Sequence, residues 1–319
     1  MSKQNGAAKK SIFKDQRVLL GIVIIAIIAV VSFINPKFIA VKNMITILQQ
    51  ISVTGILTMA MSILLIGGGV DLSIGNLMVL SGVSMAELIS LGYSVPIAVL
   101  AGMAVGIAGG LLNGVIIARS KCIPLIITLG TSQVFYGLAL TVSGGRIMSF
   151  DGAFNFIGKT KLGGVFPVML FVLAIVIVIS YIVMNYTKFG RRLTCIGGNE
   201  KTAFLSGINV VRYKAIMYGI AGFYCAIAAI VFSSRIDSIT ANAGSGYETN
   251  ALTAAIIGGV TFDGGKGTIT GAFLGCILMG VISNAMNILK VETYVQTIIT
   301  GVIIVCAVVL SNYNNIKRS

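Results

Sequence analysis

Ten apolar segments, separated by short polar stretches, follow one another along almost the whole chain. A transmembrane helix needs about 20 apolar residues, and about 17 is the minimum. Hydrophobic residues make up 56% of the 319 residues and charged residues only 10%, whereas soluble domains carry about 25% charged residues. No single water-soluble core can hide this much apolar surface, so the sequence predicts an all-α polytopic integral membrane protein. The ten segments are 18–34, 44–66, 74–91, 95–118, 123–142, 165–184, 213–234, 247–262, 268–289 and 295–311.

One of these segments is short, and a run of glycines separates two others. Segment 247–262 is shorter than the other nine and carries Glu248 near its start. The sequence Gly-Gly-Gly-Val-Asp at 67–71 separates the second and third segments. We therefore expect about ten transmembrane helices, one of them short or broken, in a single transmembrane domain that covers residues 1–319. The first segment exceeds the roughly 7–15 residues of a signal-peptide core, so we expect it to be retained.

The 23 Lys and Arg residues are distributed unevenly between the two sides of this arrangement. With ten crossings, 16 of them fall on the side of the N-terminus and 7 on the opposite side. Because positive charges gather in cytoplasmic loops, this distribution favours both termini inside the cell. It also accounts for the formal net charge of +14, so nucleic acid is not expected as a partner. The inner parts include a basic N-terminal tail (1–17) and the longest loop, 185–212, whose size suits a docking surface for a soluble partner.

The sequence lacks the residues and motifs that catalysis, metal binding and ATP binding require. The chain contains no His, and its five Cys never form a C-x-x-C pair, so neither a histidine base nor a metal site is expected. It lacks the phosphate-binding loop G-x-x-x-x-G-K-[ST] and the H-E-x-x-H and G-x-S-x-G motifs, so we expect no catalytic residue and no cofactor. A row of buried carboxylates, typical of ion-driven carriers, is not visible either. These gaps favour a pore that depends on an outside energy source.

Asp71 is the ionisable residue that most needs an explanation. An ionisable group at the middle of a bilayer costs at least about 2.5–3.5 kcal/mol. In one interpretation, Asp71 and Ser73 cap the helix that starts near Ser73, after the glycines have interrupted the preceding helix. In the other, the break enters the membrane and lines a substrate pathway. The two interpretations are compatible.

Uncharged amides also occur inside the apolar segments. An amide both donates and accepts hydrogen bonds, which suits a substrate with many hydroxyl groups. The same groups form hydrogen bonds between helices, and for any single residue both roles stay open. The candidate substrate-pathway residues are Asp71, Ser73, Asn76, Asn113, Gln133, Asn284, Asn287 and Gln296.

Glycine recurs every fourth residue in two of the segments, first at 102, 106, 110 and 114 and later at 267, 271 and 275. This spacing places the glycines on one face of a helix and predicts close packing against a neighbouring backbone. Both series lie in the next-to-last segment of a group of four, 44–142 and 213–311, which indicates a duplication. The string Gly-Gly-Val, found at 68–70 and 258–260, does not fit that offset.

Three strings resemble a known family. GGVDLSIG (68–75) is similar to the G-G-x-D-L-S-x-G signature of permease subunits in the ribose/galactose/xylose branch of bacterial ABC importers. The polar run 187–210 resembles that family's cytoplasmic loop between spans six and seven, and 244–310 resembles its C-terminal third. The strings occur in the right order and at the right spacing, so the resemblance covers most of the chain beyond residue 40. The chain departs from the pattern at Phe204, at Thr249–Leu252 and at Ser311, and these departures bear on substrate identity.

The resemblance implies several partners that composition does not indicate. The subunit would pair with a second permease copy or a close relative, carry a cytoplasmic ATPase with two nucleotide-binding domains, and receive sugar from an extracytoplasmic binding protein. The loop 187–210 would be the surface that couples the subunit to the ATPase, and a short helix at 202–206 would end at Gly207. The coupling residues implied in this way are Gly190, Arg191, Gly197, Gly198, Asn199, Ser206 and Gly207.

The sequence therefore predicts the permease subunit of an ABC importer in the bacterial inner membrane. Its substrate would be a monosaccharide, with a pentose such as ribose as the first candidate, and the chain itself would not be an enzyme because hydrolysis occurs in the partner. Two alternatives stay open: an ion-coupled secondary carrier, and an ABC permease for another solute such as a nucleoside or an autoinducer.

Overall fold

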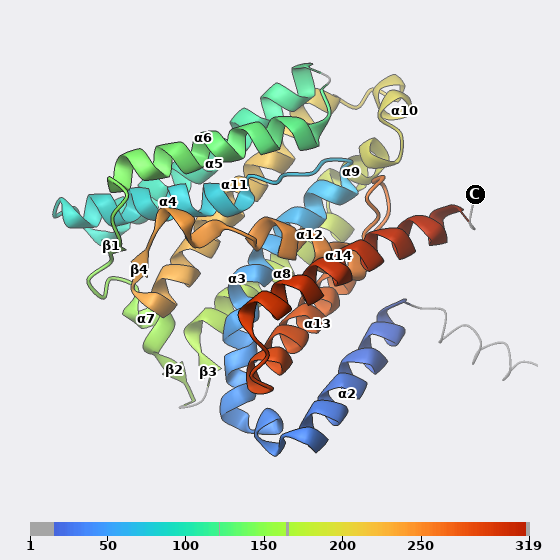
Figure 1. Ribbon diagram of the computed structural model, residues 1–319. Helices are drawn as coiled ribbons and strands as arrows, with labels where there is room; N and C mark the ends of the chain where they lie inside the picture. The colour runs from blue at the N-terminus through green and yellow to red at the C-terminus, as the bar shows by residue number, and fades with distance from the viewer. Residues whose placement is uncertain (1–15, 121, 164–165, 317–319) are drawn as a thin grey trace, which may run out of the picture.

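The computed structural model describes residues 16–120, 122–163 and 166–316, and its described part is a bundle of helices with two very short sheets (Figure 1). The helices in chain order are α2 (Gln16–Ile34), η1 (Pro36–Ile39), α3 (Val41–Ile66), α4 (Ile74–Ser90), α5 (Val95–Ser120), α6 (Pro124–Ser143), α7 (Asn155–Lys159), α8 (Val168–Tyr186), α9 (Lys188–Gly198), α10 (Glu200–Leu205), α11 (Val210–Ile236), η2 (Ala241–Gly244), α12 (Tyr247–Ile257), α13 (Ile269–Ile288) and α14 (Thr293–Ile316). The strands are β1 (Met148–Ser149), β2 (Lys161–Leu162), β3 (Phe166–Pro167) and β4 (Ser238–Ile239).

Each of the ten apolar segments coincides with one helix, which confirms the all-α membrane architecture. Seven helices in the described residues are long and apolar enough to cross a membrane, namely α2, α3, α5, α6, α8, α11 and α13. The apolar parts of α4 and α14 are shorter. Helix α12 ends at Ile257, five residues earlier than the apolar segment suggested, because Gly258 and Gly259 stop it. With 11 residues it is about 16 Å long, which is roughly half the thickness of a bilayer core.

Helices α3 and α11 form the centre of the bundle. In α3, 78% of the most apolar stretch is buried within the protein, and in α11 72% is buried. The corresponding shares in α2, α5, α6 and α8 are only 17% to 28%, and their outward faces carry large apolar side chains such as Leu100 and Ile175. Outward apolar faces around a packed centre are what a lipid environment requires, since only the buried faces need to fit protein neighbours.

Helices α3 and α12 end in the same way. Gly67 donates to the carbonyl of Ile63, and Gly69 donates to that of Leu64 at 2.8 Å. In α12, Gly258 donates to Ala254, and Val260 donates to Ala255 at 3.0 Å. The residue in between has a positive φ in both cases, +76° at Gly68 and +88° at Gly259, a conformation that glycine adopts without strain. Both ends are therefore Schellman caps, and the glycine pair at 67–68 corresponds to the pair at 258–259.

The two glycine series pack against backbone, as predicted. A Cβ at Gly106 or Gly110 on α5 would overlap backbone carbonyls of α11, and a Cβ at Gly271 or Gly275 on α13 would overlap carbonyls in and just after α12. Helix α5 packs on α4 and α11, while α13 packs on α12 and α3. These are equivalent neighbours if the groups 44–142 and 213–311 arose by duplication, so the packing supports that prediction.

Candidate substrate pathway and coupling surface

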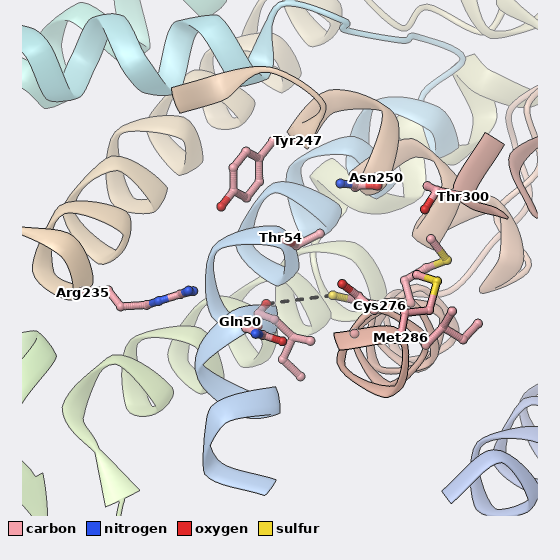
Figure 2. A pocket seen from close by; sticks show the side chains of 13 residues that line it. Gln50, Thr54, Arg235, Tyr247, Asn250, Cys276, Met286 and Thr300 are labelled. Carbon is pink, nitrogen blue, oxygen red and sulfur yellow. Dashed lines mark hydrogen bonds between the residues drawn. The ribbon is translucent and has the colours of Figure 1, made fainter. Parts of the chain in front are cut away.

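A polar cavity of about 260 Å³ lies between α3, the end of α11, α12, α13 and α14 (Figure 2). This volume is below the roughly 300–1,000 Å³ of pockets for drug-sized ligands, so the cavity suits a small solute. Its apolar wall includes Ile51, Met279 and Met286. Its uncharged polar lining consists of Gln50, Thr54, Tyr247, Asn250, Ser283 and Thr300.

Hydroxyl and amide groups reach the cavity from different helices. Gln50 and Thr54 are one turn apart on α3, and Figure 2 shows Tyr247 and Asn250 of α12 above them. Arg235, at the end of α11, is the charged residue of the lining and adds a fixed set of hydrogen-bond donors. Amides and hydroxyls both donate and accept, so the uncharged part of the lining suits a hydroxyl-rich solute.

The Asp71 region lies in the packed interior and does not line this cavity. Asp71 is 1% exposed, and its Oδ1 accepts hydrogen bonds from the backbone N–H of Ser73 (2.7 Å) and from the Ser73 hydroxyl. Asn113 on α5 donates to Asp71 Oδ2 at 3.2 Å and to Ser73 Oγ at 2.9 Å. The Tyr218 hydroxyl of α11 donates to the carbonyl of Val70 at 2.9 Å. This network fixes the turn that precedes α4. The N-cap residue of α4 is Ser73, and its side chain makes no capping hydrogen bond, so Asp71 stabilises the turn and does not cap the helix; its pathway role stays a prediction.

The amides predicted to line the pathway bond mainly to other helices. Asn284 of α13 and Asn43 of α3 exchange two hydrogen bonds, at 2.9 and 3.1 Å. Asn76 of α4 donates to the Ser132 hydroxyl of α6 at 2.8 Å. Gln296 of α14 donates to Asn287 of α13 at 3.0 Å, and Gln133 lies exposed on α6. None of the eight predicted residues lines the cavity, and their role in substrate passage remains a prediction.

The sequence prediction missed the cavity residues Gln50, Arg235, Tyr247 and Asn250. One signal was present: the short segment that became α12 carries Tyr247 and Asn250 three residues apart, on one helix face. Gln50 is next to a second glutamine, Gln49, so sequence alone does not say which one faces the cavity.

The polar loop after α8 folds into two short helices with well-defined starts. Thr187 accepts from Gly190 N–H at 3.2 Å and caps α9, and Asn199 accepts from Thr202 N–H at 2.9 Å and caps α10. Helix α10 runs from Glu200 to Leu205, close to the predicted 202–206, and Gly207 follows with a φ of +79°. Two apolar side chains of α10, Phe204 and Leu205, are 68% and 75% exposed.

The residues predicted to couple this loop to an ATPase fall into two groups. Gly190 is buried against the backbone of Met184, and Gly197 is packed against backbone of other segments. The others lie toward the surface: Arg191, Gly198, Asn199, Ser206 and Gly207. Lys214 of α11 forms an ion pair with Glu200, which ties α10 to the bundle. The loop is thus an ordered surface with exposed apolar residues, and its coupling role stays a prediction.

Comparison with known proteins connects this fold to transport. Residues 43–308 match the family described as branched-chain amino acid transport system / permease component. The ribose import permease protein of Bacillus subtilis is 35% identical over 294 residues, which cover 91% of this chain and 90% of that protein. The L-arabinose transport system permease protein of Escherichia coli is 34% identical over 319 residues (98% and 97%). The D-allose transport system permease protein of Escherichia coli is 35% identical over 289 residues (89% and 88%).

No solved structure matches the chain. The similarity to the permeases extends over nearly the full length of both partners, so it includes the glycine-capped breaks and the loop with α9 and α10. Together with the apolar helices, it identifies a multi-pass protein of the inner membrane. The chain belongs to the branched-chain amino acid transport system / permease component family.

Proposed function

We propose that this chain is the membrane permease subunit of an ABC importer for a monosaccharide, with ribose or another pentose as the first candidate. The observation that carries the proposal is the full-length similarity to sugar permeases, among which ribose import permeases recur. The cavity supports it, because its amides and hydroxyls suit a solute with a hydroxyl on almost every carbon.

In this function the chain makes and breaks no covalent bond. Both termini lie inside the cell, a second permease copy completes the pathway, and a binding protein delivers sugar from outside. A cytoplasmic ATPase with two nucleotide-binding domains docks on the surface formed by α9 and α10, where Phe204 and Leu205 offer exposed apolar contacts. Hydrolysis in that partner drives a rigid-body change that opens the pathway to alternate sides.

Uptake of radiolabelled D-ribose into proteoliposomes tests the proposal, with the permease, its ATPase and its binding protein reconstituted together. We expect uptake that needs ATP and the binding protein, and no ATPase activity from the permease alone. Unlabelled L-arabinose, D-allose and a nucleoside serve as competitors and rank the alternatives. Uptake that follows a sodium or proton gradient without ATP would instead establish a secondary carrier.

The cavity is tested by two neighbouring glutamines. Gln50→Ala removes an amide from the lining, and we expect the KM for uptake to rise about ten-fold, equivalent to the loss of one hydrogen bond of about 1.4 kcal/mol. Gln49→Ala removes the same group one residue earlier, outside the lining, and is expected to leave KM within a factor of two. Equal effects of the two variants would remove this cavity from the substrate pathway.

A further inference from the structure

Three segments that are far apart in the sequence meet at one point beside α9. They are the cap that ends α3 (Ile66 to Gly68), the end of α9 (Gly197 and Gly198), and the loop between α12 and α13 (Gly264 and Gly265). Gly265 donates its backbone N–H to the carbonyl of Ile66 at 2.9 Å, which joins the two break regions directly. Figure 1 shows α9 beside the end of α3, in agreement with their contacts. We call this meeting point the glycine junction.

The glycine junction is built from backbone against backbone. A Cβ on Gly197 would overlap the carbonyl oxygen of Ile66 and approach Gly265 N to 2.7 Å. A Cβ on Gly264 would lie 2.7 Å from Gly197 O and 2.9 Å from the Cα of Gly68. Real Cβ atoms do not approach backbone this closely, so even one methyl group would push the segments apart. The atoms nearest to each added Cβ are backbone atoms, which cannot swing aside as the end of a flexible side chain can.

The junction connects the surface of α9 and α10 to the cavity. Helix α3 contributes Gln50 and Thr54 to the cavity lining, and α12 contributes Tyr247 and Asn250. Both helices end in the Schellman caps that lead into the junction. A shift at the end of α9 therefore acts directly on the end of α3 and, through the loop at Gly264 and Gly265, on the segment that follows α12.

We propose that the glycine junction transmits movement of the α9–α10 surface to α3 and α12, so that Gly197 and Gly264 act as positioning residues for transport. The inference rests on the proposed function, in which that surface receives an ATPase. Contact of backbone on backbone makes the junction stiff, and stiffness is what a rigid-body relay between two sites requires. Without this stiff junction, the ATPase would hydrolyse ATP while the shape of the cavity stayed unchanged.

The test compares two pairs of glycines. The members of each pair have a similar backbone conformation, but only one member is packed against the junction. Gly264 and Gly246 both have a φ of +86°, but a Cβ on Gly246 meets nothing within 4 Å. Gly264→Ala and Gly246→Ala therefore place a side chain at the same positive φ, and only the first adds a methyl group that would push the segments of the junction apart. For the helical residue Gly197, the matched control is Gly21→Ala in α2, where a Cβ also meets nothing. Each variant is reconstituted with the ATPase and the binding protein, and co-purification of the ATPase confirms assembly.

We expect Gly264→Ala and Gly197→Ala to keep the ATPase bound and active but to import at least ten-fold less ribose per ATP than Gly246→Ala and Gly21→Ala. A fall in transport and hydrolysis together, or no difference between the members of a pair, would overturn the proposal. If Gly197→Ala fails to assemble, Gly264→Ala, whose added methyl group acts on the loop side of the junction, still decides the outcome.

A second readout does not depend on the sugar. Thr54→Cys places a new thiol in the cavity, in a background where Cys276, which also lines the cavity, and the exposed Cys122, Cys195 and Cys306 are Ser. We expect ATP to change the labelling rate of this thiol by a water-soluble reagent, and Gly264→Ala to abolish the change. An ATP-dependent change that persists in Gly264→Ala would refute the relay even if ribose proved to be the wrong substrate.

Discussion

The two glycine breaks share one backbone geometry but lead into different surroundings. After α3, the chain turns inward: Asp71 is 1% exposed and is held by Ser73 and Asn113. After α12, the chain turns outward into a loop that includes the exposed Asp263 and Lys266, and that closes on itself through a hydrogen bond from Thr261 N–H to the carbonyl of Lys266 at 3.1 Å. The first break is fixed inside the bundle, whereas the second lies at its surface.

This difference indicates that the helices before the two breaks differ in how freely they can move. The helix before the first break, α3, has 26 residues and is mostly buried, so it can act as a fixed part of the bundle. The helix before the second break, α12, has only 11 residues and is followed by a surface loop, so fewer helical turns hold it in place than hold α3. Because α12 is the shorter of the two helices, we expect it to be the more movable wall of the cavity, which three comparisons can check.

The largest expected effect is on the free energy of unfolding, and it compares Asp71 after the first break with Asp263 after the second. Asp71→Ala leaves the Ser73 N–H and the Asn113 amide without their acceptor in a buried site, and we expect it to lower the free energy of unfolding by about 3 kcal/mol. Asp263→Asn keeps the shape and the hydrogen-bonding oxygen of an exposed loop residue, and we expect a change within about 0.5 kcal/mol. Titration of the purified proteins with a denaturing detergent measures both. Similar losses would mean that the two breaks are equally fixed.

An intermediate effect is expected where the glycine faces pack. A methyl group at Gly110 would overlap the carbonyl of Tyr218 in α11, and one at Gly275 would overlap that of Ala254 in α12. Overpacking typically costs about 1–3 kcal/mol, and we expect Gly110→Ala near the upper value and Gly275→Ala near the lower one, since the short α12 can shift. Gly137→Ala on α6, where a Cβ meets nothing within 4 Å, is the control in the same unfolding titration. The reverse order would make α12 the more rigid element.

The smallest expected effect concerns the amide contacts that hold the helices after each break. Asn284 of α13 bonds to Asn43 of α3, and Asn76 of α4 bonds to Ser132 of α6. Double-mutant cycles with alanine should give coupling energies of about 0.6 kcal/mol for each pair, the average for hydrogen bonds between membrane helices. If the coupling energy between Asn43 and Asn284 is near zero and Asn284→Ala raises the KM for ribose uptake, Asn284 would instead belong to the substrate pathway.

The positions of the helices were predictable because hydrophobicity over about 20 residues is a property of the chain alone. The stop at Gly67 and the short helix before Gly207 arise from local chemistry in the same way. The stop at Gly258 was missed, because the expected apolar segment ran on to residue 262. The cavity was not predictable. Its lining comes from five helices, and whether Gln50 or Gln49 faces it depends on how α3 is rotated against its neighbours.

The amino-acid order alone was enough to establish that this protein lies in a membrane, roughly where its long helices lie, and which family it belongs to. Packing of the helices was needed to establish that the intramembrane amides bond mostly to residues of other segments, that Asp71 is buried and hydrogen-bonded just before α4, and that glycines 68, 197 and 264 meet. The cause is that hydrophobicity and capping act between residues near in sequence. Cavities and contacts between the backbones of different segments exist only once those segments have packed together.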